Sequence, residues 1–162
     1  MRTKRYIAMM ACAAALCALA HSLPFTFQIA QFDRARTAVS ESSFEFEDII
    51  FSYFFEAGYI VSNLPAATID NPDNVPVAQA MRIAREGSLD YLAIVVLVYD
   101  RSQSVSDAPQ SALWKLYRVS DEQMLCSGII IAKDVAGNDA AAKLKNCARN
   151  ISHDMDSALK KI

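Results

Sequence analysis

The chain has 162 residues, of which 53% are hydrophobic, and this composition supports one domain with a substantial core and argues against a disordered protein. Its formal net charge is −2 and no basic stripe is visible, which argues against nucleic-acid binding. The sequence contains no Walker loop, GxGxxG loop or GxSxG elbow, and only four glycines. Nucleotide-binding and serine-hydrolase functions therefore have no motif to support them.

The first twenty residues have the pattern of a secretory signal peptide. A positively charged start precedes an acid-free apolar run over residues 7–19, and a small-x-small cleavage site follows. The residues concerned are Arg2, Lys4, Arg5 and the tripeptide Ala18-Leu19-Ala20. The sequence predicts a signal peptide over residues 1–20, cleavage before His21, and one periplasmic domain over residues 21–162. The alternatives are an uncleaved anchor, or a lipoprotein processed at Cys12 or Cys17, although Leu16 stands where a lipobox has a small residue.

Export changes the expected charge and the chemistry of the cysteines. Removal of residues 1–20 takes away three positive charges and no acid, so the formal net charge falls from −2 to −5. Cys126 and Cys147 are then the two remaining cysteines, in a compartment where disulfides persist. A bridge between them would close a loop of about twenty residues and contribute on the order of 3 kcal/mol. The alternative is two free thiols buried in the core.

A strand and a strongly amphipathic helix open the predicted domain. Residues 25–32 alternate apolar and polar side chains, as a half-buried strand does. The helix is expected to begin at a capping box formed by Ser42 and Glu45, and Gly58 stands where a left-handed residue would end it. Its apolar face, spaced three and four residues apart, consists of Phe46, Ile49, Ile50, Tyr53, Phe54 and Ala57.

A second apolar stripe lies on the same predicted helix and consists of Phe44, Phe51 and Phe55. A helix with two apolar stripes is covered on more than one side, so these three side chains are predicted to bind a partner. The alternative is that they pack beneath a neighbouring helix.

The central part of the chain leads to a buried strand. A short strand at residues 59–61 is followed by a segment rich in proline and turn residues, so residues 63–76 are predicted to be mostly loop. A helix starts at Pro76, with Asp73 or Asn74 as its cap, and ends at Gly87. Residues 91–99 are nine consecutive apolar or aromatic residues and predict a central strand buried on both faces. A weak ligand site is predicted where this strand ends, at Tyr99, Asp100 and Arg101.

The C-terminal part predicts a hairpin and a helix. A polar loop over residues 101–111, which is a second candidate contact surface, precedes strands at 112–119 and 124–132, with Gly128 as a candidate bulge. A helix capped by Asn138 or Asp139 runs to the end of the chain. The predicted order is β-α-β-α-β-β-β-α, which is an α/β (α+β) fold with helices packed on a mixed sheet.

Three segments of this order resemble a known family. They are Phe55-Glu56-Ala57-Gly58-Tyr59-Ile60-Val61, Ala84-Arg85-Glu86-Gly87-Ser88-Leu89-Asp90-Tyr91-Leu92, and the hairpin over residues 114–131. The chain resembles the periplasmic α/β domain shared by CsgG, the N-terminal domain of TolB and LpoB. The hairpin departs from the family because its turn lacks the usual Thr-Gly pair. The resemblance implies a fold and an envelope location.

The chemistry-bearing residues do not assemble into a catalytic set. His153 and Asp156 are three residues apart and offer two metal ligands, which do not make a site, so no metal or cofactor is predicted. The sequence therefore predicts a non-enzymatic exported protein that acts through contacts with envelope proteins in assembly or activation. A periplasmic protein that binds a small ligand or glycan at the end of the central strand is the alternative. Homo-oligomerisation and peripheral membrane association stay open.

Overall fold

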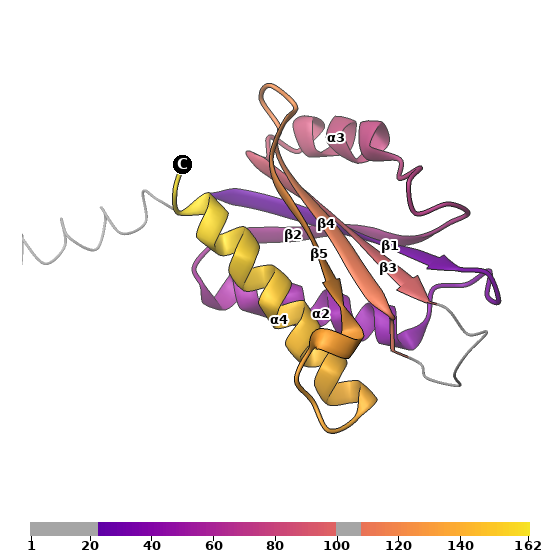
Figure 1. The fold of residues 1–162 in the computed structure, drawn as a ribbon. Coiled ribbons are helices and arrows are strands. Elements are labelled where there is room, and N and C mark those ends of the chain that lie inside the picture. Colours follow the sequence, from indigo (N-terminus) through magenta and orange to yellow (C-terminus); the bar gives the residue numbers. More distant parts are fainter. Residues whose placement is uncertain (1–22, 100–107) are drawn as a thin grey trace, which may run out of the picture.

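The computed structural model of the chain describes residues 23–99 and 108–162 (Figure 1). The predicted signal peptide, most of the polar loop, and Asp100 and Arg101 of the predicted ligand site lie outside the described residues. The elements within them are β1 (Pro24–Asp33), α2 (Glu41–Glu56), β2 (Ile60–Ile69), α3 (Val77–Glu86), β3 (Tyr91–Tyr99), β4 (Ser111–Arg118), β5 (Gln123–Ile131), the 3-10 turn η1 (Ala132–Asp134) and α4 (Ala140–Leu159). This succession confirms the predicted order of strands and helices.

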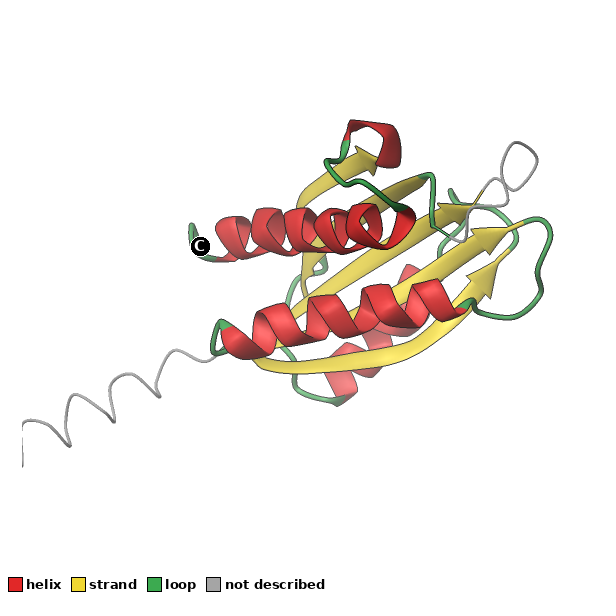
Figure 2. Ribbon diagram, turned by 90° about the horizontal axis from the view of Figure 1, so that it is seen from below, coloured by secondary structure: helices red, strands yellow, loops and turns green. Residues whose placement is uncertain are grey.

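The described strands form one mixed sheet in the order β2-β1-β3-β4-β5. β1 is parallel to both β2 and β3, whereas β4 is antiparallel to β3 and to β5. Helices α2 and α4 pack side by side on one face of the sheet, and α3 packs on the other (Figure 2). The α+β class with a mixed sheet is therefore confirmed.

Strand β3 is the centre of the core. Eight of its nine residues are buried. Because successive strand residues point to opposite faces, Tyr91, Ala93, Val95, Leu97 and Tyr99 pack toward α2 and α4, while Leu92, Ile94 and Val96 pack toward α3. The nine-residue apolar run thus fills two hydrophobic clusters at once, as the sequence predicted.

Helix α2 is fixed to the sheet by one row of side chains. Phe46, Ile50 and Phe54 recur at every fourth residue and have no exposed surface. Phe54 stacks on Phe25 of β1 with ring centroids 4.2 Å apart. The predicted end of the helix is confirmed, since Gly58 has a φ of 88°, which glycine adopts without steric cost.

Strand β2 is longer than predicted. It runs to Ile69, so the prediction that residues 63–76 are mostly loop is wrong for their first half. β2 is the outermost strand on its side of the sheet. Pro65 is tolerated there because proline lacks the backbone N–H, and an edge strand has no neighbour on its outer side to receive a hydrogen bond. The pairing with β1 shifts between Gln28 and Ala30, which is a bulge at this proline.

Two of the three predicted helix caps are wrong. The cap residue of α2 is Ser40 rather than Ser42, and its side chain makes no capping hydrogen bond. α3 begins after Pro76, also without a side-chain cap. The prediction for α4 is confirmed at Asp139, whose carboxylate accepts a hydrogen bond from the backbone N–H of Ala142 at 2.7 Å.

Gly128 is not at a bulge. It pairs in regular register with Trp114, and the register shift of this hairpin lies between Leu116 and Tyr117. A Cβ atom on Gly128 would stand 2.7 Å from the indole nitrogen of Trp114. The glycine is therefore needed for the close approach of the tryptophan ring.

Candidate functional site: the exposed surfaces of helix α2

The predicted aromatic stripe of α2 reaches solvent. Phe44 is 50% exposed and Phe55 is 67% exposed, while Phe51 is half-buried against the core. The rings of Phe51 and Phe55 are stacked, with an interplanar angle of 12° and centroids 6.4 Å apart. Two phenylalanines this exposed on one helix form an apolar surface that no described element covers.

The rest of the α2 surface is acidic. The helix contains five acidic residues and no lysine or arginine. Four of the acids are exposed, namely Glu41, Glu45, Asp48 and Glu56. The fifth, Glu47, is buried and accepts a hydrogen bond from the side chain of Asn63 in β2. The exposed face of α2 therefore combines apolar and acidic side chains.

A groove of about 930 Å³ separates the outer surfaces of α2 and α4. Ile49, Tyr53 and Leu144 supply its apolar side chains. One wall carries the acids Glu45, Asp48 and Glu56 of α2, and the other carries Lys145, Arg149 and His153 of α4. Among the described residues, no ion pair joins the two walls. The two helices therefore present opposite charges to solvent along one groove.

A buried carboxylate ties the end of α4 to α2 and to the turn between α2 and β2. Asp156 is 5% exposed and accepts hydrogen bonds from the hydroxyls of Tyr59, at 2.7 Å, and Tyr53, at 3.4 Å. Lys160 lies 2.6 Å from the same carboxylate. Burial is the larger cause, and the hydrogen bond to Asp156 the next, of a raised pKa at Tyr59. Because Asp156 is engaged here while His153 is exposed, these two residues do not form a metal site.

Tyr99 of the predicted ligand site is engaged inside the protein. Its ring is buried and its hydroxyl lies 2.9 Å from the Ser43 hydroxyl and 3.1 Å from that of Ser42. The side-chain oxygen of Gln31 accepts hydrogen bonds from the hydroxyl of Ser43 and from the backbone N–H of Ser40. The hydroxyl of Tyr99 thus holds the start of α2 against the sheet.

Cys126 and Cys147 are both free thiols in the structure and both pack in the cluster beneath α4. Cys147 is buried, and this burial raises the pKa of its thiol to about 11. Burial, and then the nearby charge of Asp154, also raise the pKa of Cys126. Raised thiol pKa values oppose formation of the nucleophilic thiolate, so neither cysteine has the character of a catalytic nucleophile. Their pairing in a disulfide stays a prediction.

Across residues 23–99 and 108–162, no group of three or more His, Cys, Asp and Glu side chains is placed to hold a metal ion. No helix within the same residues has the length and apolar character required to cross a membrane.

A family model with the description "Uncharacterised protein" matches residues 25–160. The chain belongs to this family. The match extends from the second residue of β1 to just beyond the end of α4. No curated protein matches the chain.

Solved structures share the fold at low sequence identity. PelC from Paraburkholderia phytofirmans, described as a dodecamer, matches in two crystal forms with TM-scores of 0.51 and 0.50 and 16% identity. These matches cover 81% of this chain and 87% and 85% of the PelC chains. Identity at this level shows a shared fold and nothing more.

Two of the three proteins that the sequence resembles, TolB and LpoB, are among the matching solved structures. TolB from Acinetobacter baumannii matches with 15% identity and a TM-score of 0.47, over 88% of this chain and 30% of TolB. The C-terminal domain of LpoB from Escherichia coli matches with 15% identity and a TM-score of 0.42, over 65% of this chain and 79% of that domain. Neither score carries an argument about function. The resemblance to CsgG stays a prediction.

Proposed function

We propose that this protein is exported and acts without enzymatic activity, by binding another protein in the bacterial cell envelope during assembly or activation. The observation that carries the proposal is the exposed aromatic surface of α2, formed by Phe44 and Phe55 beside the half-buried Phe51. Aromatic side chains dominate the energetics of protein interfaces because they bury a large rigid area. The signal-peptide pattern of residues 1–20 supports export.

The chemistry of this surface indicates what the partner offers. Four exposed acids lie on the same helix as the phenylalanines, and α2 carries no basic residue. A partner with an apolar patch edged by lysine or arginine would bury the rings and pair the acids. Since the related fold of PelC is described as a dodecamer, a second copy of this chain is an outcome that the test must recognise.

Site-specific photocrosslinking in cells tests the proposal. A benzophenone amino acid is placed at position 44 or 55 of the exported protein, and at Ile83 of α3 as a control. Ile83 is also an exposed apolar residue, with 36% exposure, but it lies on the opposite face of the sheet. We expect one envelope protein to crosslink from positions 44 and 55 and not from 83. Equal crosslinking from all three positions, or none, contradicts the proposal, and a crosslinked dimer identifies self-association instead.

Serine substitutions give the energetic counterpart. Phe44→Ser with Phe55→Ser should weaken binding of the crosslinked partner by roughly a hundredfold, because truncating two interface aromatics costs about 3 kcal/mol or more. Ile83→Ser should leave the affinity unchanged. The thermal unfolding temperature of each variant shows whether the fold is preserved, since these side chains are already exposed to solvent.

A further inference from the structure

The two outer strands of the sheet differ in how their edges are protected. β2, at one edge, is interrupted by Pro65 and a bulge, which are common devices against the pairing of an additional strand. β5, at the other edge, contains no proline and no charged residue among its nine residues. Its single irregularity lies near the hairpin turn, and residues 126–131 pair regularly with residues 111–116. An extended edge of six residues is therefore open to a further strand.

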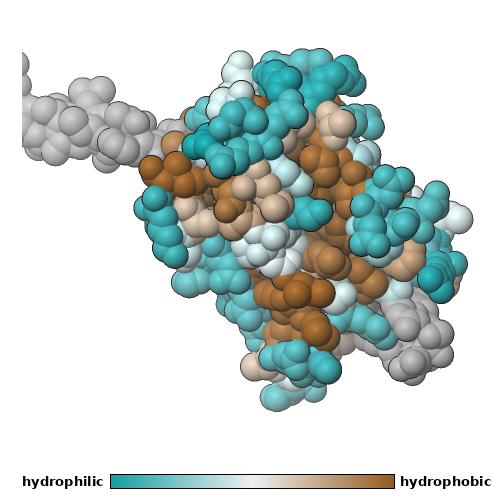
Figure 3. Space-filling view, turned by 45° about the horizontal axis from the view of Figure 1, so that its top comes forward, coloured by the Kyte–Doolittle hydropathy of each residue, from teal (hydrophilic) through white to brown (hydrophobic). Residues whose placement is uncertain are grey.

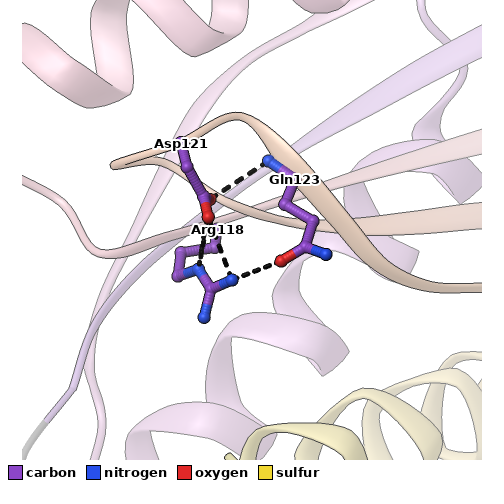
Figure 4. Close-up of polar contacts among 3 residues, drawn as sticks. All are labelled: Arg118, Asp121 and Gln123. Carbon is purple, nitrogen blue, oxygen red and sulfur yellow. Dashed lines mark hydrogen bonds and ion pairs between the residues drawn. The ribbon is translucent and has the colours of Figure 1, made fainter.

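Among the described residues, the backbone of this edge pairs with β4 alone. In the part of the chain that the structure describes, no side chain hydrogen-bonds to the backbone of residues 124–131. The hairpin turn nevertheless holds β5 in place. The guanidinium of Arg118 binds both carboxylate oxygens of Asp121 and the side chain of Gln123 (Figure 4). The edge is thus preformed, which lowers the entropy lost when another strand binds.

One side of β5 is apolar and exposed. Met124, Ile129 and Ile131 are 51%, 58% and 40% exposed. They project from the same face of the sheet as Leu113 and Tyr117 of β4, the face on which α3 packs against β3. Figure 3 shows a band of apolar surface between polar regions on this side of the molecule. A strand added to β5 would bury apolar side chains against this surface.

The other side of β5 borders a groove that contains two acidic side chains. A groove of about 430 Å³ lies between β5 and α4, and Asp134, Asn150, His153 and Asp154 line it together with the strand. The two carboxylates are exposed, and the Asp154 carboxylate has no cationic partner among the described residues other than a 3.9 Å approach to His153. Side chains that enter this groove from an added strand would be favoured if they were basic.

We propose that the β5 edge binds an extended segment of a partner protein, which pairs with residues 126–131 and alternates apolar with basic side chains. The apolar side chains meet Ile129 and Ile131, and the basic ones meet Asp134 and Asp154. A second copy of β5 fits this site less well because it would bring no basic residue to the acidic groove. The inference rests on the proposed function and names a second surface for it, remote from the phenylalanines of α2.

A designed peptide tests the edge directly. The probe is the acetylated and amidated heptapeptide Lys-Val-Lys-Ile-Lys-Val-Lys, whose length matches the ~20 Å of the open edge. Its counterpart has Glu at each Lys. With the isotope-labelled exported protein, we expect the lysine peptide to shift the amide resonances of residues 126–131 and to slow their hydrogen exchange. The glutamate peptide should bind at least tenfold more weakly, since several charge contacts change from attractive to repulsive.

A charge exchange identifies the groove. In Asp134→Lys with Asp154→Lys, the preference should reverse, so that the glutamate peptide binds more tightly than the lysine peptide. Asp73→Lys is the matched control, because Asp73 is an exposed acid between β2 and α3, and it should keep the original preference. Ile129→Lys should abolish binding of the lysine peptide. All of these substitutions are at exposed positions, and amide spectra confirm the fold of each variant.

The outcomes separate this inference from the proposed function. Peptide binding that maps to α2, an unchanged preference after the charge exchange, or no binding at all overturns the β5 proposal. A dimer of the wild-type protein that Ile129→Lys dissociates also overturns it, in favour of a second copy. The photocrosslinks from positions 44 and 55 do not depend on β5, so they stand or fall separately from each of these results.

Discussion

The buried carboxylate of Asp156 provides the sharpest test of how the helices are held to the sheet. It connects the end of α4 with Tyr59, at the turn from α2 to β2, through a hydrogen bond of 2.7 Å. Substitution of Asp156 by alanine removes the carboxylate and leaves the half-buried hydroxyl of Tyr59 without its hydrogen-bond acceptor. Asp154 is the matched control, since it lies on the same helix two residues earlier with 56% of its side chain exposed.

The expected loss of stability follows from these contacts. A hydrogen bond to a charged group contributes about 1.5–3 kcal/mol. The ion pair with Lys160 adds only about 0.3–0.5 kcal/mol, because the lysine side chain is 66% exposed. The hydroxyl of Tyr53, at 3.4 Å, is too distant to add much. Asp156→Ala should therefore lower the free energy of unfolding by about 3 kcal/mol, Asp156→Asn by about half as much, and Asp154→Ala by less than about 0.5 kcal/mol.

Urea denaturation at pH 7 measures all three changes in the free energy of unfolding. The midpoint temperature of thermal unfolding should fall by about 6–12 °C in Asp156→Ala. The pH matters because the pKa of Tyr59 is raised in the folded state. The stability that the Tyr59 hydrogen bond contributes is complete below pH 10, which is about the pKa of tyrosine in the unfolded chain. It is lost as the pH rises from there through the higher pKa of Tyr59 in the folded protein. In Asp156→Asn the pKa of Tyr59 should move back toward 10, which titration of the tyrosine absorbance detects.

A loss of less than 1 kcal/mol in Asp156→Ala, or an equal loss in Asp154→Ala, would refute this reasoning. The first result would show that water replaces the carboxylate without cost. The second would show that charge on α4, rather than the buried contact with Tyr59, determines the effect.

Two further predictions concern the hairpin and the thiols. Gly128→Ala should lower the free energy of unfolding by about 1–3 kcal/mol, because the added Cβ would overlap the ring of Trp114. Gly87→Ala is the control and should lower it little, because a Cβ there meets only ordinary contacts of 3.4 Å or more. Urea denaturation of the two variants measures the difference. In the reduced, folded protein, Cys126 should react with iodoacetamide at pH 8 well before Cys147, whose pKa of about 11 leaves roughly one thiolate in a thousand. Equal rates would contradict the burial of Cys147. If neither thiol of protein isolated without reductant reacts until a reductant is added, that protein contains the disulfide.

The elements predicted correctly are those whose pattern is determined by burial. β3 is a run of apolar residues buried on both faces. In α2, the buried side chains of Phe46, Ile50 and Phe54 form one row. β2 was missed beyond Val61 because an edge strand with a proline and a bulge has the composition of a loop. The helix caps of α2 and α3 were missed because serine and asparagine near a helix start have several hydrogen-bonding choices.

The candidate site was predictable where it lies on one element. The stripe of Phe44, Phe51 and Phe55 follows from helical spacing alone, and the structure places two of its three rings in solvent. The groove between α2 and α4 joins residues about ninety positions apart in the sequence, and the contact of Tyr59 with Asp156 does the same. Such pairs carry no local pattern, so they emerge only when the sheet brings the helices together.

The asymmetry of the sheet edges limits what this molecule can build. Endless head-to-tail stacking of sheets requires that one edge of each copy accept the opposite edge of the next. Pro65 and its bulge prevent β2 from filling that role, although β5 is open. Two copies of this chain joined through β5 would therefore close on each other as a pair, because the edge left free on each copy is β2. Such a pair would not extend into a fibril, because Pro65 and the bulge disfavour pairing at both of its remaining edges.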